Sequence, residues 1–312
     1  MNNRRNFIKK TIFSSAGILA FNAVPNEAFA KNETVKITIL HTNDFHSHID
    51  PFPDNDPKFA GLGGAVRRAA LIKKIRTEEK NVLLLDAGDI FQGTPYFNMY
   101  GGELEFKLMS LMQYDGANVG NHDFDNGLEG LVKQLPYANF PFINCNYDFS
   151  DTAMSGKTIP HKILIKDDIK IGIFGLGVEL EGLVDKKNSG NTVFIDPVRK
   201  AAEEAFHLKH NEKCDLIICL SHLGFSSNGK KINDVDLAKQ SKNIDIIIGG
   251  HSHTFLDKPL SYKNSDGKEI LVAQAGWAGI RLGRIDYIFE KKSKKKTSEG
   301  YSIKISEKSI AI

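Results

Sequence analysis

The sequence predicts an α/β protein, and two observations point to that fold class. Apolar runs of strand length recur along the chain, and several are continuous rather than alternating, as expected for strands that are covered on both faces. Stretches with helical periodicity separate the early runs, and this alternation is typical of βαβ units with parallel strands. With 312 residues, 41% hydrophobic and 25% charged, the composition is that of a globular protein, which excludes disorder as the main state.

The elements can be placed in order along the chain. Strands are expected at 35–40, 81–86, 117–119, 142–145, 163–165, 170–175, 216–220, 244–248, 270–273, 281–289 and 302–305. Helices are expected at 63–79, 103–113, 128–135, 197–209 and 235–241. The first helix has a predicted apolar stripe made by Val66, Ala69, Ala70, Ile72, Lys73 and Ile75, with basic residues beside it. Residues 166–168 predict a tight hairpin turn, and the lack of a helical pattern after residue 270 predicts antiparallel strands there.

Residues 1–30 have the features of an export signal. Adjacent Arg4 and Arg5 precede an uncharged stretch at 11–26 and a small-residue cleavage site at 28–30, and the arginine pair resembles the twin-arginine signal. A membrane anchor is the alternative, but the uncharged stretch is shorter than the roughly 20 apolar residues of a spanning helix. No cysteine precedes Cys145, so none could carry a lipid near the cleavage site. We expect a signal peptide at 1–30, one domain at 31–312, no stable membrane anchor, and a periplasmic or secreted protein.

The charge balance argues against one class of partner. Positions 1–30 hold four basic residues and one acidic residue, and removing them from the totals of 41 and 38 leaves 37 of each. A chain with no net charge gives no electrostatic basis for binding a nucleic acid polymer.

Five of the apolar runs end in side chains that bind metal ions well. The residues that follow these runs are Asp44, His46, Asp89, Asn121, His222, His251 and His253. In parallel sheets, ligands bind beyond the carboxyl ends of the strands, so we expect these side chains to meet. In extended chain, residues i and i+2 point to the same side. The pairs at 44/46 and 251/253 can therefore each offer two ligands to one pocket.

The set suits two divalent cations. Imidazole, carboxylate and amide ligands fit borderline metals such as Mn, Zn, Co or Fe. One histidine at a strand end would usually be structural, but the same chemistry at five strand ends favours a metal site. Two ions about 3.5–4 Å apart can polarise a phosphoryl oxygen and activate a water. The expected chemistry is therefore phosphoester hydrolysis.

The motifs around these residues resemble those of the calcineurin-like metallophosphoesterases. Longer segments around the motifs resemble the catalytic domain of bacterial 5′-nucleotidases and UDP-sugar hydrolases. These segments are 39–44 (ILHTND), 85–94 (LDAGDIFQGT), 120–127 (GNHDFDNG) and 249–253 (GGHSH). The resemblance covers about residues 35–290. It implies the metallo-dependent phosphatase fold, a four-layer αββα sandwich with a dinuclear site between the sheets.

The resemblance also implies a role for each residue. The first metal would be held by Asp44, His46, Asp89 and His253, with Asp89 bridging to the second. The second would be held by Asn121, His222 and His251, and Asn121 would also contact substrate.

Next to these ligands, His122 and Asp125 resemble the catalytic dyad of the family. A charged His122 can stabilise the phosphoryl and leaving oxygens, and Asp125 can orient it and favour its charged form. A helix N-cap before residue 128 is the alternative for Asp125. The family usually has glutamate where this chain has Asp123, to which we assign no role.

The expected substrate is a small phosphoester, first of all a nucleotide. Such nucleotidases usually continue into a C-terminal domain that binds the base, whereas this chain ends at Ile312. Two interpretations stay open: a separate polypeptide completes the nucleotide site, or the enzyme is a phosphoesterase of broad specificity. A protein partner would need an apolar patch. The residues expected to form it, with core packing as the alternative for each, are Phe52, Phe59, Phe91, Tyr96, Phe97 and Tyr100.

Overall fold

The computed structural model describes residues 34–226, 229, 231–290 and 296–310. The expected export signal lies outside this part of the chain. Among the described residues, no helix combines the length and the apolar character that crossing a bilayer requires.

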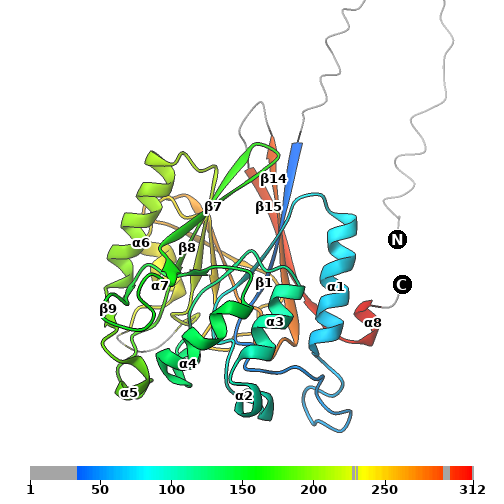
Figure 1. Cartoon of the computed structure of the whole chain (residues 1–312). Helices are drawn as coiled ribbons and strands as arrows, with labels where there is room; N and C mark the ends of the chain where they lie inside the picture. Colours follow the sequence, from blue (N-terminus) through cyan, green and yellow to red (C-terminus); the bar gives the residue numbers. More distant parts are fainter. Residues whose placement is uncertain (1–33, 227–228, 230, 291–295, 311–312) are drawn as a thin grey trace, which may run out of the picture. The chain divides into compact units, whose positions relative to one another are not determined.

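Two β-sheets form the centre of the fold (Figure 1). The first sheet has the strand order β15-β14-β1-β2-β3-β4-β6, and the second has the order β12-β13-β11-β10-β8-β7. Their strands are β1 (Thr34–Thr42), β2 (Val82–Asp86), β3 (Gly116–Ala117), β4 (Phe142–Ile143), β6 (Thr158–Ile159), β7 (His161–Lys166), β8 (Ile169–Leu176), β10 (Leu216–Ser221), β11 (Ile246–Gly249), β12 (Leu260–Lys263), β13 (Glu269–Ala273), β14 (Arg281–Glu290) and β15 (Lys296–Lys304). A small third sheet pairs β5 (Tyr147–Asp148) with β9 (Val193–Phe194).

The strands that were expected to carry the site run parallel within each sheet. In the first sheet β1 pairs with β2 and β2 with β3, and in the second β8 pairs with β10 and β10 with β11, all in parallel. The carboxyl ends of neighbouring parallel strands lie at the same edge of a sheet. This topology therefore gathers the loops that follow β1, β2 and β3, and separately those that follow β10 and β11.

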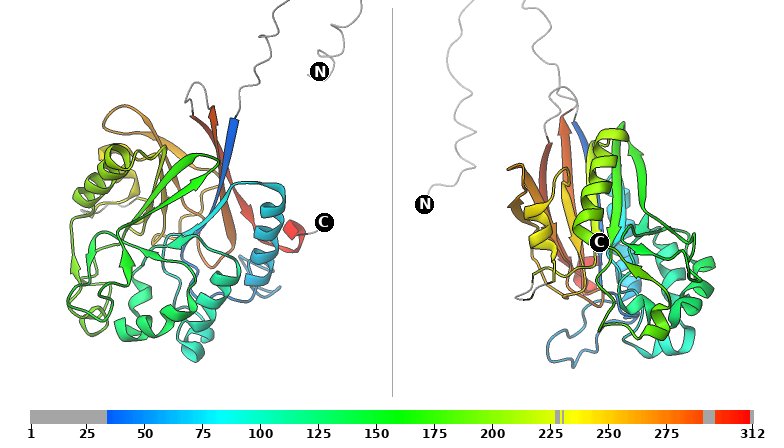
Figure 2. Two further views of the ribbon diagram at one scale, coloured as in Figure 1. Left: turned by 45° about the horizontal axis from the view of Figure 1, so that its top comes forward. Right: turned by 90° about the vertical axis from the view of Figure 1, so that its left-hand side faces the viewer.

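Helices cover the outer faces of both sheets. The α-helices of the described chain are α1 (Ala65–Glu78), α2 (Pro95–Tyr100), α3 (Glu103–Leu111), α4 (Gly127–Gln134), α5 (Lys186–Ser189), α6 (Pro197–Phe206), α7 (Asp234–Gln240) and α8 (Glu307–Ile310). Figures 1 and 2 show α1 and α3 on the opposite side of the strands from α6 and α7.

Three hydrophobic clusters separate the four layers and confirm the predicted αββα sandwich. Leu84 of β2 packs toward α1 and α3, whereas Ile39 of β1 and Ile218 of β10 belong to a cluster between the sheets. Ile217, one residue earlier in β10, faces the third cluster together with Ala205 of α6. Side chains alternate between the two faces of a strand, so continuous apolar runs fill two clusters at once. Each fully buried isoleucine stabilises the fold by about 1.5–3 kcal/mol.

Most predicted elements are present near their predicted positions. The hairpin between β7 and β8 turns at Asp167 and Asp168, which have φ values of 46° and 68°, as a two-residue primed turn requires. The prediction missed β12 and the two-residue strands β5, β6 and β9. It also missed the short helices α2, α5 and α8, because such short or polar segments carry no periodic signal.

The predicted apolar stripe of α1 was wrong in part. Val66 is 80% exposed and Ala70 is exposed, whereas Arg68 and Leu71 are buried beside Ile72. The reason is Arg68, whose guanidinium carbon lies 3.9 Å from the centre of the Phe45 ring. This cation–π contact brings a charged residue to the inner face of the helix and rotates the apolar stripe away from Val66.

Candidate metal centre

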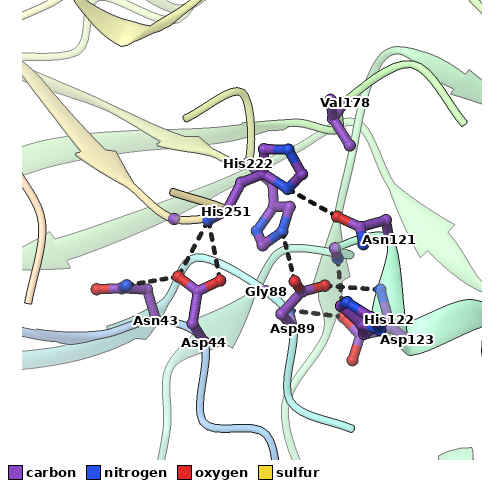
Figure 3. Close-up of polar contacts among 12 residues, drawn as sticks. Asn43, Asp44, Gly88, Asp89, Asn121, His122, Asp123, Val178, His222 and His251 are labelled. Atoms are coloured by element: carbon purple, nitrogen blue, oxygen red, sulfur yellow. Dashed lines mark hydrogen bonds and ion pairs between the residues drawn. The ribbon is translucent and has the colours of Figure 1, made fainter. Parts of the chain in front are cut away.

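The seven predicted ligand residues lie together at the carboxyl ends of the strands of both sheets. Figure 3 shows Asp44, Asp89, Asn121, His222 and His251 among them. Two sets of three residues have donor atoms that all lie within 4.8 Å of one another. The first set is Asp44, His46 and His253, and the second is Asp89, His222 and His251. Loops after β1 and β2 in one sheet thus meet loops after β10 and β11 in the other.

In the first set, three side chains converge on one point. His253 Nε2 lies 3.3 Å from Asp44 Oδ1, and His46 Nε2 lies 3.9 Å from the same oxygen. The two Nε2 atoms are 3.0 Å apart. Two imidazole nitrogens and a carboxylate oxygen therefore face one small volume.

In the second set, a fully buried histidine faces a buried carboxylate. His222 Nε2 lies 3.0 Å from Asp89 Oδ2, and His251 Nδ1 lies 2.8 Å from Asn121 Oδ1 (Figure 3). Asp89 Oδ2 is also 3.8 Å from His46 Nε2 of the first set. Asp89 is thus the carboxylate that lies between the two sets.

Backbone contacts fix which ring nitrogens face the centre. His222 Nδ1 lies 2.8 Å from the carbonyl oxygen of Ala87, and His46 Nδ1 lies 3.1 Å from that of Gln92. A carbonyl oxygen only accepts hydrogen bonds, so each Nδ1 carries a proton and donates it. In the neutral tautomers, the Nε2 lone pairs then point at carboxylate oxygens, an arrangement that a shared cation stabilises.

In the metal-free protein a proton can take the place of that cation. Burial disfavours a charged His222, but the Asp89 carboxylate outweighs this effect and raises the pKa of His222 to about 10. His222 lowers the pKa of Asp89 in turn, although burial opposes it. Divalent metal binding must displace this proton, as at other histidine sites. The donor set therefore fits two divalent cations.

Five of the seven residues have a left-handed backbone, and four of them form the pairs 44/46 and 251/253, for which we expected extended chain. Their φ values are 49° for Asp44, 49° for His46, 57° for Asp89, 71° for His251 and 52° for His253. Consequently the two histidines of the 251/253 pair reach different sets rather than one pocket. Each such residue costs on the order of 1–3 kcal/mol, which the surrounding structure has to offset.

Asp123 is one buried side chain that offsets this cost, and sequence reasoning gave it no role. Its carboxylate accepts hydrogen bonds from the backbone N–H groups of Asp89, Ile90, Phe91 and Gly120, at 2.8–3.2 Å. It thereby holds the loop after β2 against the loop after β3. Burial, reinforced by the charge of Asp89, raises the pKa of Asp123 to about 7, while the N–H groups lower it.

The loops after β1 and β11 have similar supports. Asn43 Nδ2 donates to Asp44 Oδ2 and to the carbonyl oxygen of Gly276, both at 2.6 Å. Gln274, at the end of β13, spans the 250–254 loop. Its Nε2 donates to the Gly250 carbonyl at 2.7 Å, and its Oε1 accepts from Ser252 Oγ at 3.0 Å and from the backbone N–H of Thr254.

A glycine is required at one close approach in the centre. A Cβ built on Gly120 would overlap the carboxylate and the backbone nitrogen of Asp89. The loops after β2 and β3 can therefore meet only if position 120 lacks a side chain.

The predicted dyad lies beside the first set of ligands. His122 Nδ1 is 2.8 Å from Asp125 Oδ2, and the backbone N–H of His122 donates to Asp89 Oδ1 at 2.7 Å. The hydrogen bond to Asp125 raises the pKa of His122, and Asp89 adds to this effect, while burial opposes it. Helix α4 has Asn126 rather than Asp125 at its N-cap position. The capping alternative for Asp125 is therefore not supported.

The aromatic residues expected to form a docking patch do not share one environment. Phe91 is fully buried in the first cluster, and Phe97 packs against that cluster. Tyr96 and Tyr100 lie on α2, where Tyr100 is 46% exposed. Phe52 and Phe59 are half-buried in the loop after β1. Core packing therefore explains Phe91 and Phe97 but not the other four.

Residues 37–255 match the calcineurin-like phosphoesterase family. The chain belongs to this family. Among its relatives, the snake venom 5′-nucleotidase of Crotalus adamanteus is 34% identical in an alignment of 289 positions that covers 86% of this chain and 48% of the relative. The 5′-nucleotidase of Bos taurus is also 34% identical, over 86% of this chain and 49% of the relative.

Solved structures of this phosphoesterase family show the same fold. The 5′-nucleotidase precursor of Thermus thermophilus superposes with a TM-score of 0.80 at 30% identity, covering 88% of this chain and 55% of that one. A calcineurin-like phosphoesterase of Bacillus subtilis superposes with a TM-score of 0.71 at 27% identity, covering 89% and 95%. The chain spans about half the length of the curated 5′-nucleotidases that it matches.

Proposed function

We propose that the protein is a two-metal phosphomonoesterase that acts on nucleotides. The observation that carries this proposal is the pair of donor sets joined by Asp89. One ion would be held by Asp44, His46, Asp89 and His253, and the other by Asp89, Asn121, His222 and His251. Two divalent ions supply Lewis acidity, which polarises the phosphoryl group and makes water a competent nucleophile at neutral pH.

The dyad completes the chemistry from the protein side. Asp125 accepts a hydrogen bond from Nδ1–H of His122, and in the imidazolium form Nε2–H is then free to donate a proton to the leaving oxygen. The raised pKa keeps more of His122 in the imidazolium form that such a donor needs. The amide of Asn121, next in sequence, would contact the phosphoryl group as well as the second ion.

The test is phosphate release by purified protein loaded with Mn, Co or Zn. Substrates should include AMP, UDP-glucose and an aryl phosphate, so that nucleotide preference and broad specificity give different patterns. Chelated protein is the control. A preparation that holds two equivalents of metal and releases phosphate from none of these substrates would contradict the proposal.

A second candidate is a catalytic subunit that needs another polypeptide for nucleotide binding. It is favoured by the length of the relatives, since the matched region is about half of each. Adding the product of a neighbouring reading frame that encodes the other half should then raise kcat/KM for nucleotides. Equal activity with and without that product rejects this candidate.

The metal and the cellular location are also proposals. Histidine, carboxylate and amide ligands suit Mn, Zn, Co or Fe, and elemental analysis of protein purified from its natural host would identify the ion.

Export by the twin-arginine route rests on Arg4 and Arg5. Replacing both by lysine should keep the protein in the cytoplasm, and unchanged export would refute the route.

A further inference from the structure

Five aromatic rings gather beside the metal centre and are not used by the proposed chemistry. We call them the rim cluster, and they are His48, Phe52, Phe59, Phe255 and Trp277. They come from three loops, and all five are half-buried. Neighbouring ring centres lie 5.1–6.2 Å apart. Three of the rings, those of His48, Phe52 and Phe59, come from the irregular segment between β1 and α1, which projects as a blue loop at the foot of the ribbon in Figures 1 and 2.

The rim cluster touches the metal centre through Trp277. Its ring is parallel to that of His253, within 3°, with centres 5.5 Å apart. His253 in turn lies edge-on to His46 at 4.9 Å, and His46 lies edge-on to His122 at 5.1 Å. One row of rings therefore leads from the proton donor, across two ligands of the first ion, to Trp277.

Trp277 is more exposed to solvent than the residues next to it in the chain. Residues 270–276 and 278–280 are all buried, whereas Trp277 is only half-buried. Exposed apolar surface costs about 25 cal/mol per Å² relative to burial. Large aromatic rings that stay partly exposed next to a polar centre are typical of binding sites, where a ligand covers them.

We infer that the rim cluster is a stacking platform for the planar base of the nucleotide substrate. This inference rests on the proposed function and names the part of the substrate that gives it selectivity. A phosphate bound at the first ion would lie next to His253, whose ring centre is 5.5 Å from that of Trp277, so only the ribose would have to span the distance from the phosphate to the rings. Stacking needs no particular hydrogen-bond pattern, so the platform would accept any base.

The test compares AMP with ribose 5-phosphate, which has the same phosphoester and no base. Wild-type protein should show a higher kcat/KM for AMP. Trp277→Leu and Phe52→Leu should lower the ratio of the two kcat/KM values by about 5- to 150-fold, the effect of losing one base–aromatic stack. Any loss of metal affects both substrates alike and cancels in this ratio. Trp277→Phe keeps an aromatic ring and should retain most of the preference, and Phe206→Leu, at an exposed ring on α6, should leave the ratio unchanged.

A fluorescence measurement tests binding of the base to the rim cluster without any hydrolysis. Trp277 is the only tryptophan in the sequence, so its fluorescence reports on the rim cluster alone. Adenosine should quench this emission in the metal-loaded protein, and ribose at the same concentration should not. Two results would overturn the inferred platform and leave the phosphoesterase activity intact. One is hydrolysis of both phosphoesters at equal kcat/KM, and the other is a base preference that appears only after a second polypeptide is added. Quenching by adenosine in a protein that hydrolyses neither substrate would support the platform and contradict the proposed function.

Discussion

Removal of the Gln274 side chain should weaken both metal sites with little effect on the rest of the fold. This side chain makes three hydrogen bonds across the 250–254 loop, to Gly250, Ser252 and Thr254. At about 0.5–1.5 kcal/mol each, the three bonds stabilise the loop by roughly 1.5–4.5 kcal/mol. That is comparable to the cost of two left-handed histidines in the same loop, on the order of 1–3 kcal/mol each. Without these bonds the loop is free to relax away from the strained conformation that presents its ligands.

The variant Gln274→Met keeps the volume of the side chain and removes the hydrogen bonds. Loss of a group that orients metal ligands typically lowers affinity 10- to 100-fold. Because the loop carries one histidine of each donor set, titration calorimetry with Mn should show this loss at both sites. Gln134→Met, at a buried glutamine in α4, is the matched control and should bind metal normally. Unchanged affinity in Gln274→Met, or a loss confined to one site, would refute the reasoning.

Three further predictions concern the dyad and the proton balance. His122→Asn should lower turnover roughly 10²- to 10⁴-fold with unchanged metal content, and loss of metal would instead make His122 a ligand. Asp125→Asn replaces the charged acceptor of the His122 hydrogen bond by a neutral amide oxygen and so lowers the pKa of His122. The fall of kcat at high pH should therefore move to lower pH, and an unmoved profile would contradict the pairing. Because Asp89 holds a proton on His222 up to a pKa of about 10, metal binding should release protons and tighten as the pH rises. Calorimetry in buffers of different ionisation enthalpy measures this release.

The parts of the fold that the sequence predicted are those with strong local patterns. Runs such as 216–220 are buried on both faces, so their apolar character alone marks a strand. The strand β12 has only half-buried or exposed residues, and its pairing with β13 depends on a partner that local pattern does not reveal. The inner face of α1 was mispredicted for the same reason, because Arg68 is buried by a contact with Phe45 that lies 23 positions away.

The clustering of the seven proposed ligands could be predicted because residue type and position at a strand end are both local signals. Their supports could not. Gln274 looks like an ordinary polar residue after a strand, and Asn43 acts on Gly276, more than two hundred positions later. The resemblance placed His251 and His253 at different ions, which agrees with the two donor sets. The extended-chain argument failed, because it did not anticipate the left-handed backbone at both residues.

The measurement that tests the central claim most directly is a crystal structure of metal-loaded protein with anomalous scattering recorded at the edge of the bound metal. We predict two anomalous peaks about 3.5–4 Å apart, with the Asp89 carboxylate between them. One peak should contact Asp44, His46 and His253, and the other Asn121, His222 and His251. A single peak, or two peaks that do not share Asp89, would contradict the account.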